Sequence, residues 1–372
     1  MKKQNLKIDR TLLFITLGLL AYGLVVLYSA SAVQSFADFG NTSHYIIHQA
    51  LYGALLGLLA MYICSRIDYH IWQKYLPYLI FLSLFLLLLV KIPGLGFASG
   101  GAARWVKLGP VNFQPAELAK LVIILYLSAW VEKKRGTIND FYYGLLPSLC
   151  IIALFGALIL WQPDFGTMLV LLLVSFFILF AAGINWKYFF YSFVLAALAL
   201  YAFIKIEPYR VKRLTTFLNP ALDPKGISYQ INQALLAIGS GGLWGFGYGL
   251  SRQKHNYLPA VLNDSIFAVF AEELGFFRVL IALALFAFFA LKGFQIAKNA
   301  PDTFGKMAAL GITSWITLQA LINIAAILNL LPLTGIPLPF FSYGSTALIA
   351  NLAAVGILLN ISKFGRRAVA RA

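Results

Sequence analysis

The chain has 372 residues, of which 61% are hydrophobic and only 11% are charged, and its mean hydropathy is +0.82. Soluble globular proteins are about half apolar and about a quarter charged, so this composition excludes a soluble domain. The formal net charge of +16 is largely explained by the Lys and Arg residues that set membrane topology. It is therefore no evidence for a nucleic-acid partner, and none is expected.

Apolar runs of about 18 residues or more recur along the whole sequence, which is the pattern of membrane-spanning helices. We predict an all-α, polytopic membrane protein with about ten transmembrane helices and one membrane domain over residues 1–372. The first run lacks a small-residue cleavage motif, which favours a retained helix over a signal peptide. The predicted spans are 11–31, 46–64, 76–92, 114–131, 144–161, 167–184, 188–206, 265–291, 307–330 and 346–362.

Lysine and arginine collect in alternate short loops and at both ends of the chain, whereas the opposite short loops at 32–45, 162–166 and 331–345 contain neither. Cytoplasmic loops carry an excess of these residues. We therefore place both termini in the cytoplasm, in a multi-pass protein of the cytoplasmic (inner) membrane.

His44 and His48 lie four residues apart near the outer end of the second span. Two imidazoles on one helical face begin a metal site only if a third or fourth ligand joins them, and none is nearby in the sequence. We expect two polar residues at the membrane interface and no metal site.

Two outer segments carry basic residues against this charge rule: 93–113, with Arg104 and Lys107, and the large extracytoplasmic loop at about 207–263, between helices seven and eight. Long loops cross a membrane largely regardless of charge, so one interpretation is that these basic residues have no specific function. The other is an outward-facing anion site, since such clusters suit phosphate groups. The basic residues of the large loop are Arg210, Lys212, Arg213, Lys225, Arg252 and Lys254.

Two acidic sites precede the large loop. Glu117 and Lys120, in "FQPAELAKL", are three residues apart on one face of the fourth span. They form either a structural ion pair or a unit in which Glu117 positions Lys120 toward a polar cavity. Asp164, in "WQPDFG", follows Pro163 in a short outer turn, and ordinary turn chemistry is the favoured interpretation.

Within the large loop, "GSGGLWGFGYG" at 239–249 matches neither the dinucleotide-binding nor the P-loop pattern. Its glycines favour tight turns and a close approach of backbone segments. We expect this stretch to be folded against the membrane domain.

The sequence "YLPAVLNDSIFAVFAEELGFF" at 257–277 carries three acids into a span, where ionisable residues indicate function. Asp264 stands where the loop ends, as a helix N-cap or as a general base. Glu272 and Glu273 lie two turns deeper, and at least one must face the protein interior. Arg278 is a possible partner.

The chain resembles the SEDS family, the FtsW and RodA peptidoglycan polymerases, over nearly its whole length. The segments that carry the resemblance are "ARWVKLGPVNFQPAELAKL" (103–121), "QPDFGT" (162–167), "PYRVKRLTTFLNPALDPKGISYQINQALLAIGSGGLWGFGYG" (208–249), "YLPAVLNDSIFAVFAEELG" (257–275) and "LLPLTGIPLPFFSYGSTALIANLAAVGILLNIS" (330–362). The resemblance implies ten transmembrane helices and a large loop between the seventh and eighth. The family's essential aspartate lies in L-P-E-x-x-T-D-F-I-F, which aligns with Leu258 to Phe267 and implies Asp264.

This sequence departs from the family pattern at several positions near Asp264. Ala260 replaces the usual Glu, Leu262 and Asn263 replace His-Thr, Ser265 replaces Phe, and Ser345 replaces the second glycine of S-Y-G-G. The stretches "SRQKHNYLP" and "LLPLTGIPLPF" are closer to division-type FtsW than to elongation-type RodA.

The resemblance implies an inverting glycosyltransferase that polymerises lipid II into β-1,4 glycan at the outer face of the membrane, for cell division or cell shape. Asp264 would be the catalytic base, and Arg104, Arg210 and Arg213 would bind the donor pyrophosphate. Lys120 would reach toward the cavity, held by Glu117, while Asp164, Glu272 and Glu273 would support the site. No cofactor is assigned from the sequence; a divalent cation, Mg or Mn, could assist, but the sequence shows no dedicated cage of ligands for one.

The implied partners are lipid II, the nascent glycan strand, a class B penicillin-binding protein and other divisome or elongasome membrane proteins. A lipid II flippase is the alternative function. Transporters of that kind often show two related halves, and this sequence shows no such internal symmetry. A scaffold without activity would leave the intramembrane acids unexplained.

Overall fold

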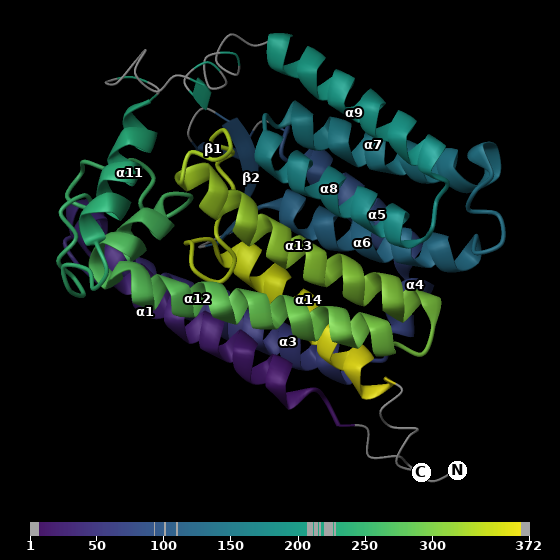
Figure 1. The fold of residues 1–372 in the computed structure, drawn as a ribbon, viewed down its shortest axis with the longest axis horizontal. Helices are drawn as coiled ribbons and strands as arrows, with labels where there is room; N and C mark the ends of the chain where they lie inside the picture. The colour runs from purple at the N-terminus through teal and green to yellow at the C-terminus, as the bar shows by residue number, and fades with distance from the viewer. Residues whose placement is uncertain are drawn as a thin grey trace.

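The computed structural model describes residues 7–92, 94–99, 102–108, 111–206 and 228–365, together with residues 211, 215, 217, 218 and 226. Most of the described chain is helical and the long helices run side by side (Figure 1). The helices are α1 (Arg10–Phe39), α2 (His44–His48), the π-helical η1 (Gln49–Leu55), α3 (Leu56–Arg66), α4 (His70–Lys74), α5 (Leu76–Leu89), α6 (Pro115–Lys133), the π-helical η2 (Phe141–Leu145), α7 (Leu146–Trp161), α8 (Phe165–Ala181), α9 (Trp186–Ile206), α11 (Tyr229–Gly241), α12 (Ile266–Asn299), α13 (Thr303–Ile327) and α14 (Ser345–Lys363).

Each predicted span coincides with a helix or with a helix that continues from a π-helical turn. Six described helical segments are long and apolar enough to cross a membrane: Arg10–Phe39, His44–Arg66, Phe141–Trp161, Ile266–Asn299, Thr303–Ile327 and Ser345–Lys363. Three shorter apolar helices are Leu76–Leu89, Phe165–Ala181 and Trp186–Leu198. The chain is therefore a multi-pass, mostly helical membrane protein.

The prediction of an all-α fold is wrong in one segment, because the loop at 93–113 forms a small antiparallel sheet. Its strands β1 (Gly96–Ser99), β2 (Ala102–Leu108) and β3 (Val111–Phe113) pair in sequence order. Val106 pairs with Gly96 on one side and with Phe113 on the other. In the sequence, glycine and proline stand between these strands and favour turns, a short-range signal that a search for long apolar runs does not detect.

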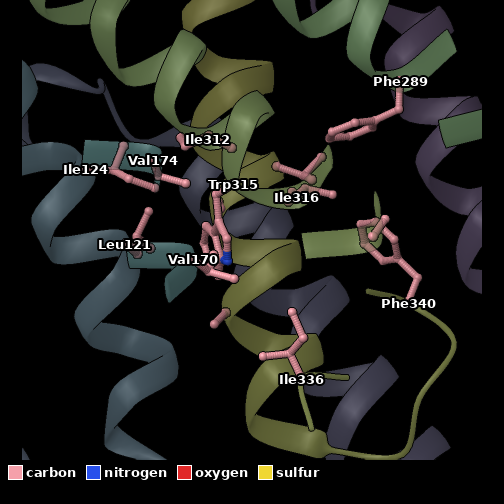
Figure 2. Close-up of a cluster of buried hydrophobic side chains, with 14 of the residues drawn as sticks. Leu121, Ile124, Val170, Val174, Phe289, Ile312, Trp315, Ile316, Ile336 and Phe340 are labelled. Carbon is pink, nitrogen blue, oxygen red and sulfur yellow. The ribbon is translucent and has the colours of Figure 1, made fainter. Parts of the chain in front are cut away.

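The interior of the bundle is centred on Trp315 of α13, whose ring is fully buried. Figure 2 shows this indole between side chains of α6, α8 and α13, among them Leu121, Ile124, Val170, Val174, Ile312 and Ile316. Lipid tails are as apolar as these side chains, so tight packing and interhelical hydrogen bonds hold such helices together. Gly356 of α14 illustrates the close approach, since an added Cβ would lie 2.5 Å from the Met61 carbonyl oxygen of α3.

Helix α12 is broken at Gly275, which adopts φ 73° and ψ 177°. The break frees backbone groups that must find partners inside a membrane protein. The glycine-rich segment 242–247 supplies them. Phe246 and Gly247 donate to the carbonyls of Glu272 and Glu273, and Phe276 donates to the Gly242 carbonyl at 3.0 Å. The predicted folded, close-packed glycine segment is thus confirmed, as an insert in a broken helix.

We expect Gly245→Ala to destabilise the fold by about 2 kcal/mol or more, because strained backbone and steric overlap coincide there. Gly245 has φ 79°, and an added Cβ would lie 2.2 Å from the Glu273 carbonyl oxygen. The control is Gly239→Ala in α11, where an added Cβ meets nothing within 4 Å. Thermal unfolding in detergent measures both variants, and equal melting temperatures would contradict the close fit.

Candidate active site

Asp264 lies in the turn that leads into α12, and its side chain is partly exposed. Ser265, not Asp264, is the N-cap residue of α12, so the structure places Asp264 one position before the cap. Gln230 of α11 donates from Nε2 to Asp264 Oδ2 at 3.3 Å and to Ser265 Oγ at 3.0 Å. The carboxylate therefore lies at the junction of α11 and α12.

The backbone of this turn is fixed by distant segments. Asn323 of α13 donates from Nδ2 to the Asp264 carbonyl at 3.0 Å. Tyr343 N–H donates to the Leu262 carbonyl at 2.8 Å, and the Ser342 hydroxyl donates to the Asn263 carbonyl. Hydrogen bonds to successive carbonyls leave the Asp264 side chain on a turn that is held at every residue from 262 to 264.

Ala260, one of the departures from the family pattern, begins this turn with φ 53°. The Ala260 carbonyl accepts hydrogen bonds from the backbone N–H groups of Asn263 and Ser265. A left-handed conformation costs a residue with a Cβ about 1–2 kcal/mol. Such strain persists where surrounding contacts over-determine it, as the contacts of residues 262–264 do here.

A pocket of about 480 Å³ opens beside the turn and includes Leu262 and Asn263 in its wall. Its other walls come from the end of α1, from α2, from the sheet and from the segment before α14, and include Phe39, His44, His48, Trp105 and Tyr343. The two histidines were predicted only as interface residues. Their spacing gave no sign of the pocket, because the turn that completes it lies more than 200 residues away.

His48 and Tyr343 form a contact across this pocket wall, with 3.0 Å between His48 Nδ1 and the Tyr343 hydroxyl. Burial raises the pKa of Tyr343 to about 12, so its hydroxyl keeps its proton at physiological pH. Gln49 of η1 accepts from the Gly344 N–H at 3.1 Å and thereby joins the same segment to the second span. The wall of the pocket is thus a connected polar layer.

Arg104 and Asp164 meet at the α7–α8 turn. Arg104 of β2 donates to the backbone carbonyls of Gln162 and Pro163, which docks the sheet on this turn. Asp164 is the N-cap of α8, and its side chain accepts from the Thr167 N–H at 3.2 Å and from Gln114 Nε2 at 3.0 Å. The predicted turn chemistry of Asp164 is confirmed.

Glu117 and Lys120 form a buried ion pair in α6, with 2.8 Å between Lys120 Nζ and Glu117 Oε1. Lys120 Nζ also donates to Gln319 Oε1 at 2.8 Å and lies 4.9 Å from the centre of the Trp315 ring. The gap beside Lys120 is lined mainly by aliphatic side chains and is too small for a water molecule. The expected polar cavity is absent there, because α8 and α13 pack closely on α6.

Exchanging these charges, as Glu117→Lys with Lys120→Glu, should restore less than half of the stability that Lys120→Met alone removes. The exchange would place a carboxylate toward Gln319 Oε1 and the negative face of the Trp315 ring, and both contacts would repel it. Detergent-solubilised yield and melting temperature measure the effect. An exchange variant with wild-type stability and activity would show that only the pairing of charges matters.

Glu273 pairs with Lys254 and not with Arg278, which the sequence offered only as a possible partner. Lys254 Nζ lies 2.8 Å from Glu273 Oε1, and both side chains are buried. The Ser29 hydroxyl of α1 donates to Glu273 Oε2 at 2.6 Å. The outer loop folds back over α12, which brings this basic residue of the loop into the interior.

Glu272 accepts hydrogen bonds from the next turn of the same loop. The Arg252 N–H donates to Glu272 Oε1 at 3.0 Å, and the Ser251 hydroxyl donates to Glu272 Oε2 at 2.5 Å. Arg278, the possible partner named from the sequence, donates instead to the carbonyls of Trp244 and Leu274. The two glutamates therefore hold the loop that leads toward Asp264.

Arg210 and Arg213, the other predicted pyrophosphate ligands, lie outside the described residues. Within the described ranges, no group of three or more His, Cys, Asp or Glu side chains is arranged to hold a metal ion. The structure brings together Asp264, the pocket and the glutamate-held loop. It places Lys120 in the packed interior of the bundle.

Fold and site together define a polytopic membrane protein with a partly exposed aspartate, held on a braced turn beside a polar and aromatic pocket. The chain belongs to the FtsW/RodA/SpoVE family, whose model is described as "Cell cycle protein" and matches residues 10–367.

Curated relatives match this chain over nearly their whole length. Stage V sporulation protein E of Bacillus subtilis is 40% identical over 358 residues, which are 96% of this chain and 98% of that protein. A probable peptidoglycan glycosyltransferase FtsW of Geobacter sp. strain M18 is 38% identical and covers 95% of this chain and 96% of its own. A probable peptidoglycan glycosyltransferase FtsW of Nitrosomonas europaea is 40% identical, over 95% of this chain and 92% of that protein.

Solved structures show the same fold. One belongs to work on the structural coordination of polymerization and crosslinking by a peptidoglycan synthase complex. It has a TM-score of 0.78 at 28% identity and covers 95% of this chain and 97% of that one. The rod shape determining protein RodA of Thermus thermophilus has a TM-score of 0.70 at 29% identity, over 95% of this chain and 96% of that one.

Proposed function

We propose that this chain is a division-type peptidoglycan glycosyltransferase that polymerises lipid II by single displacement, with Asp264 as the base. The observation that carries the proposal is the setting of Asp264. Its carboxylate is partly exposed while the backbone on which it stands is fixed at successive carbonyls. A general base needs that combination of access and fixed position.

In the proposed reaction, the 4-hydroxyl oxygen of the acceptor sugar attacks the anomeric carbon of the donor. The bond from that carbon to the pyrophosphate oxygen breaks, undecaprenyl pyrophosphate leaves, and the hydroxyl proton passes to Asp264. Base catalysis of this kind contributes about 10²–10⁴-fold. The Gln230 amide, 3.3 Å from Asp264 Oδ2, would orient the carboxylate.

We assign ten membrane crossings, both termini to the cytoplasm and the site to the outer face of the cytoplasmic membrane, with the large loop between helices seven and eight. The sheet and α11 lie at one end of the bundle, while the start of α1 and the end of α14 lie at the other (Figure 1). Near those ends, Asp9 N–H donates to the Ser362 hydroxyl at 3.0 Å. This placement agrees with the orientation inferred from the distribution of lysine and arginine among the loops.

The donor pyrophosphate is assigned to Arg104, Arg210 and Arg213, because guanidinium groups bind phosphate oxygens in pairs. Arg104 stands on the sheet that lines the pocket. A Mg or Mn ion, if required, would take phosphate oxygens as ligands, because Asp264 is a single carboxylate and such ions need about six oxygens.

A class B penicillin-binding protein is the proposed partner, together with other membrane proteins of the divisome or elongasome. The support is the similarity to a structure that belongs to a peptidoglycan synthase complex. The glycan strand made here would be the partner's substrate.

The competing hypothesis is a lipid II flippase. The two activities can be told apart because a flippase needs two compartments and a polymerase does not. Detergent micelles offer no second compartment, so only a polymerase forms product in them. We expect the purified chain, with its transpeptidase partner added, to convert lipid II into glycan in detergent. Movement of labelled lipid II across liposome membranes without any polymer in detergent would favour the flippase.

A further inference from the structure

The segment that is inserted into the break of α12 presents apolar side chains outward. Leu243 and Trp244 are 58% and 69% exposed, and Leu250, just after the inserted segment, is 62% exposed. Phe276 and Phe277, just past the break, are also exposed, and the Trp244 and Phe277 rings lie 5.0 Å apart. We name these five residues the interfacial patch. Exposed apolar side chains gathered on one part of a surface indicate an interaction site.

Two exposed arginines flank the interfacial patch. Arg278 Nη1 donates to the Trp244 carbonyl at 2.7 Å and to the Leu274 carbonyl at 3.2 Å, which fixes the guanidinium at the break. The Arg252 guanidinium lies 5.1 Å from the centre of the Phe246 ring. Both cations thus contact one short turn, 244–246. Among the described residues, no carboxylate lies within ion-pair distance of either arginine.

The exposed surface of α12 continues the interfacial patch toward the other end of the bundle, through Leu280, Ile281 and Phe288. On a membrane-spanning helix, such a face contacts lipid tails. A tryptophan beside arginines at the end of that face is typical of the layer of lipid head groups, where amphipathic rings and cations collect. The occupant that fits this continuity of apolar surface and charge is a lipid with a negative phosphate.

We propose that the interfacial patch binds a phospholipid with an anionic head group, whose phosphate lies between Arg252 and Arg278 and whose acyl chains cover the exposed rings. Guanidinium groups suit phosphate oxygens. The site shares no residue with the walls of the pocket beside Asp264. It is a second site on the protein, and its assignment to the outer leaflet rests on the proposed orientation.

The test uses the full chain in nanodiscs that contain phosphatidylcholine and phosphatidylglycerol, with brominated acyl chains on one lipid at a time. Bromine quenches nearby tryptophan emission. The chain has seven tryptophans, so the Trp244 signal is obtained by subtracting the emission of a Trp244→Phe variant. We expect Trp244 to be quenched by both lipids. Corrected for mole fraction, brominated phosphatidylglycerol should quench about fivefold more effectively for each arginine engaged.

Arg252→Gln should lower this preference about fivefold while quenching persists, because that side chain carries none of the hydrogen bonds of the inserted segment. Arg252→Gln with Arg278→Gln should abolish the preference. Lys187→Gln, which removes an exposed cation in the first turn of α9, is the control and should leave it unchanged. Equal quenching by the two lipids in the wild type would overturn the head-group site. No quenching of Trp244 by either lipid would overturn the lipid contact itself. Neither result depends on turnover, so both are separate from the proposed catalytic function.

Discussion

Asp264→Asn should lose lipid II polymerisation by at least about 100-fold and keep wild-type thermal stability. The amide matches the carboxylate in size and keeps a carbonyl oxygen for the hydrogen bond from Gln230, but it cannot accept the acceptor's proton. General base catalysis contributes about 10²–10⁴-fold. The measurement is the initial rate of glycan formation at matched protein concentration, with melting temperature recorded on the same samples.

A capping role for Asp264 gives the opposite expectation. Asparagine caps a helix about as well as aspartate, so the variant would remain active, and Ser265 already stands at the N-cap position of α12. Asp68→Asn, at an exposed aspartate between α3 and α4, is the matched control and should polymerise normally. More than about a tenth of the wild-type rate in Asp264→Asn would contradict the assignment of the base.

Lys254→Met should destabilise the protein by about 3–5 kcal/mol, because it leaves the buried Glu273 carboxylate without its cation. Lys254 Nζ also donates to the Gly249 carbonyl at 2.7 Å, so the loop that leads to Asp264 would loosen as well. We therefore expect activity to fall together with stability. Unfolding in detergent, followed by loss of tertiary signal, measures the first effect.

The double variant Lys254→Met with Glu273→Gln should recover most of the lost stability. The glutamine amide is neutral and still offers an oxygen to the Ser29 hydroxyl and the Ser251 N–H, which now bond Glu273. Lys306→Met, at an exposed lysine near the start of α13, controls for the loss of a lysine. If Lys254→Met were as stable as Lys306→Met, the ion pair would have no structural role.

Hydropathy and charge predicted the positions of the helices well. In a membrane, a long apolar run can satisfy the hydrogen bonds of its backbone only as a helix. Asp264 could be singled out as a candidate, since an acid at the start of a span is costly without a role, but the local sequence did not separate a base from a helix cap. The sheet at 96–113 was missed because its strands are short and its segment is not strongly apolar. The periodicity of a sequence indicates single helices or strands, and it does not show which strands pair.

The contacts that organise the site could not be predicted for a related reason. Lys254 and Glu273 meet only because α12 breaks at Gly275 and receives the segment 242–247, and neither event has a local sequence signal stronger than a glycine. His48 and Tyr343 are 295 residues apart. The acids at 272 and 273 posed a question about catalysis, and the structure assigns them to holding a loop.

The configuration of the new glycosidic bond tests the central claim most directly. A single displacement at an α-linked pyrophosphate donor, with Asp264 as the base, gives a β-1,4 linkage. Polymer made from lipid II by the purified chain should therefore be cleaved by a muramidase specific for β-1,4 bonds and show the β-anomeric coupling by NMR. An α-linked product would mean that the donor configuration is retained through a covalent intermediate, and it would contradict the assignment of Asp264 as the base of a direct transfer.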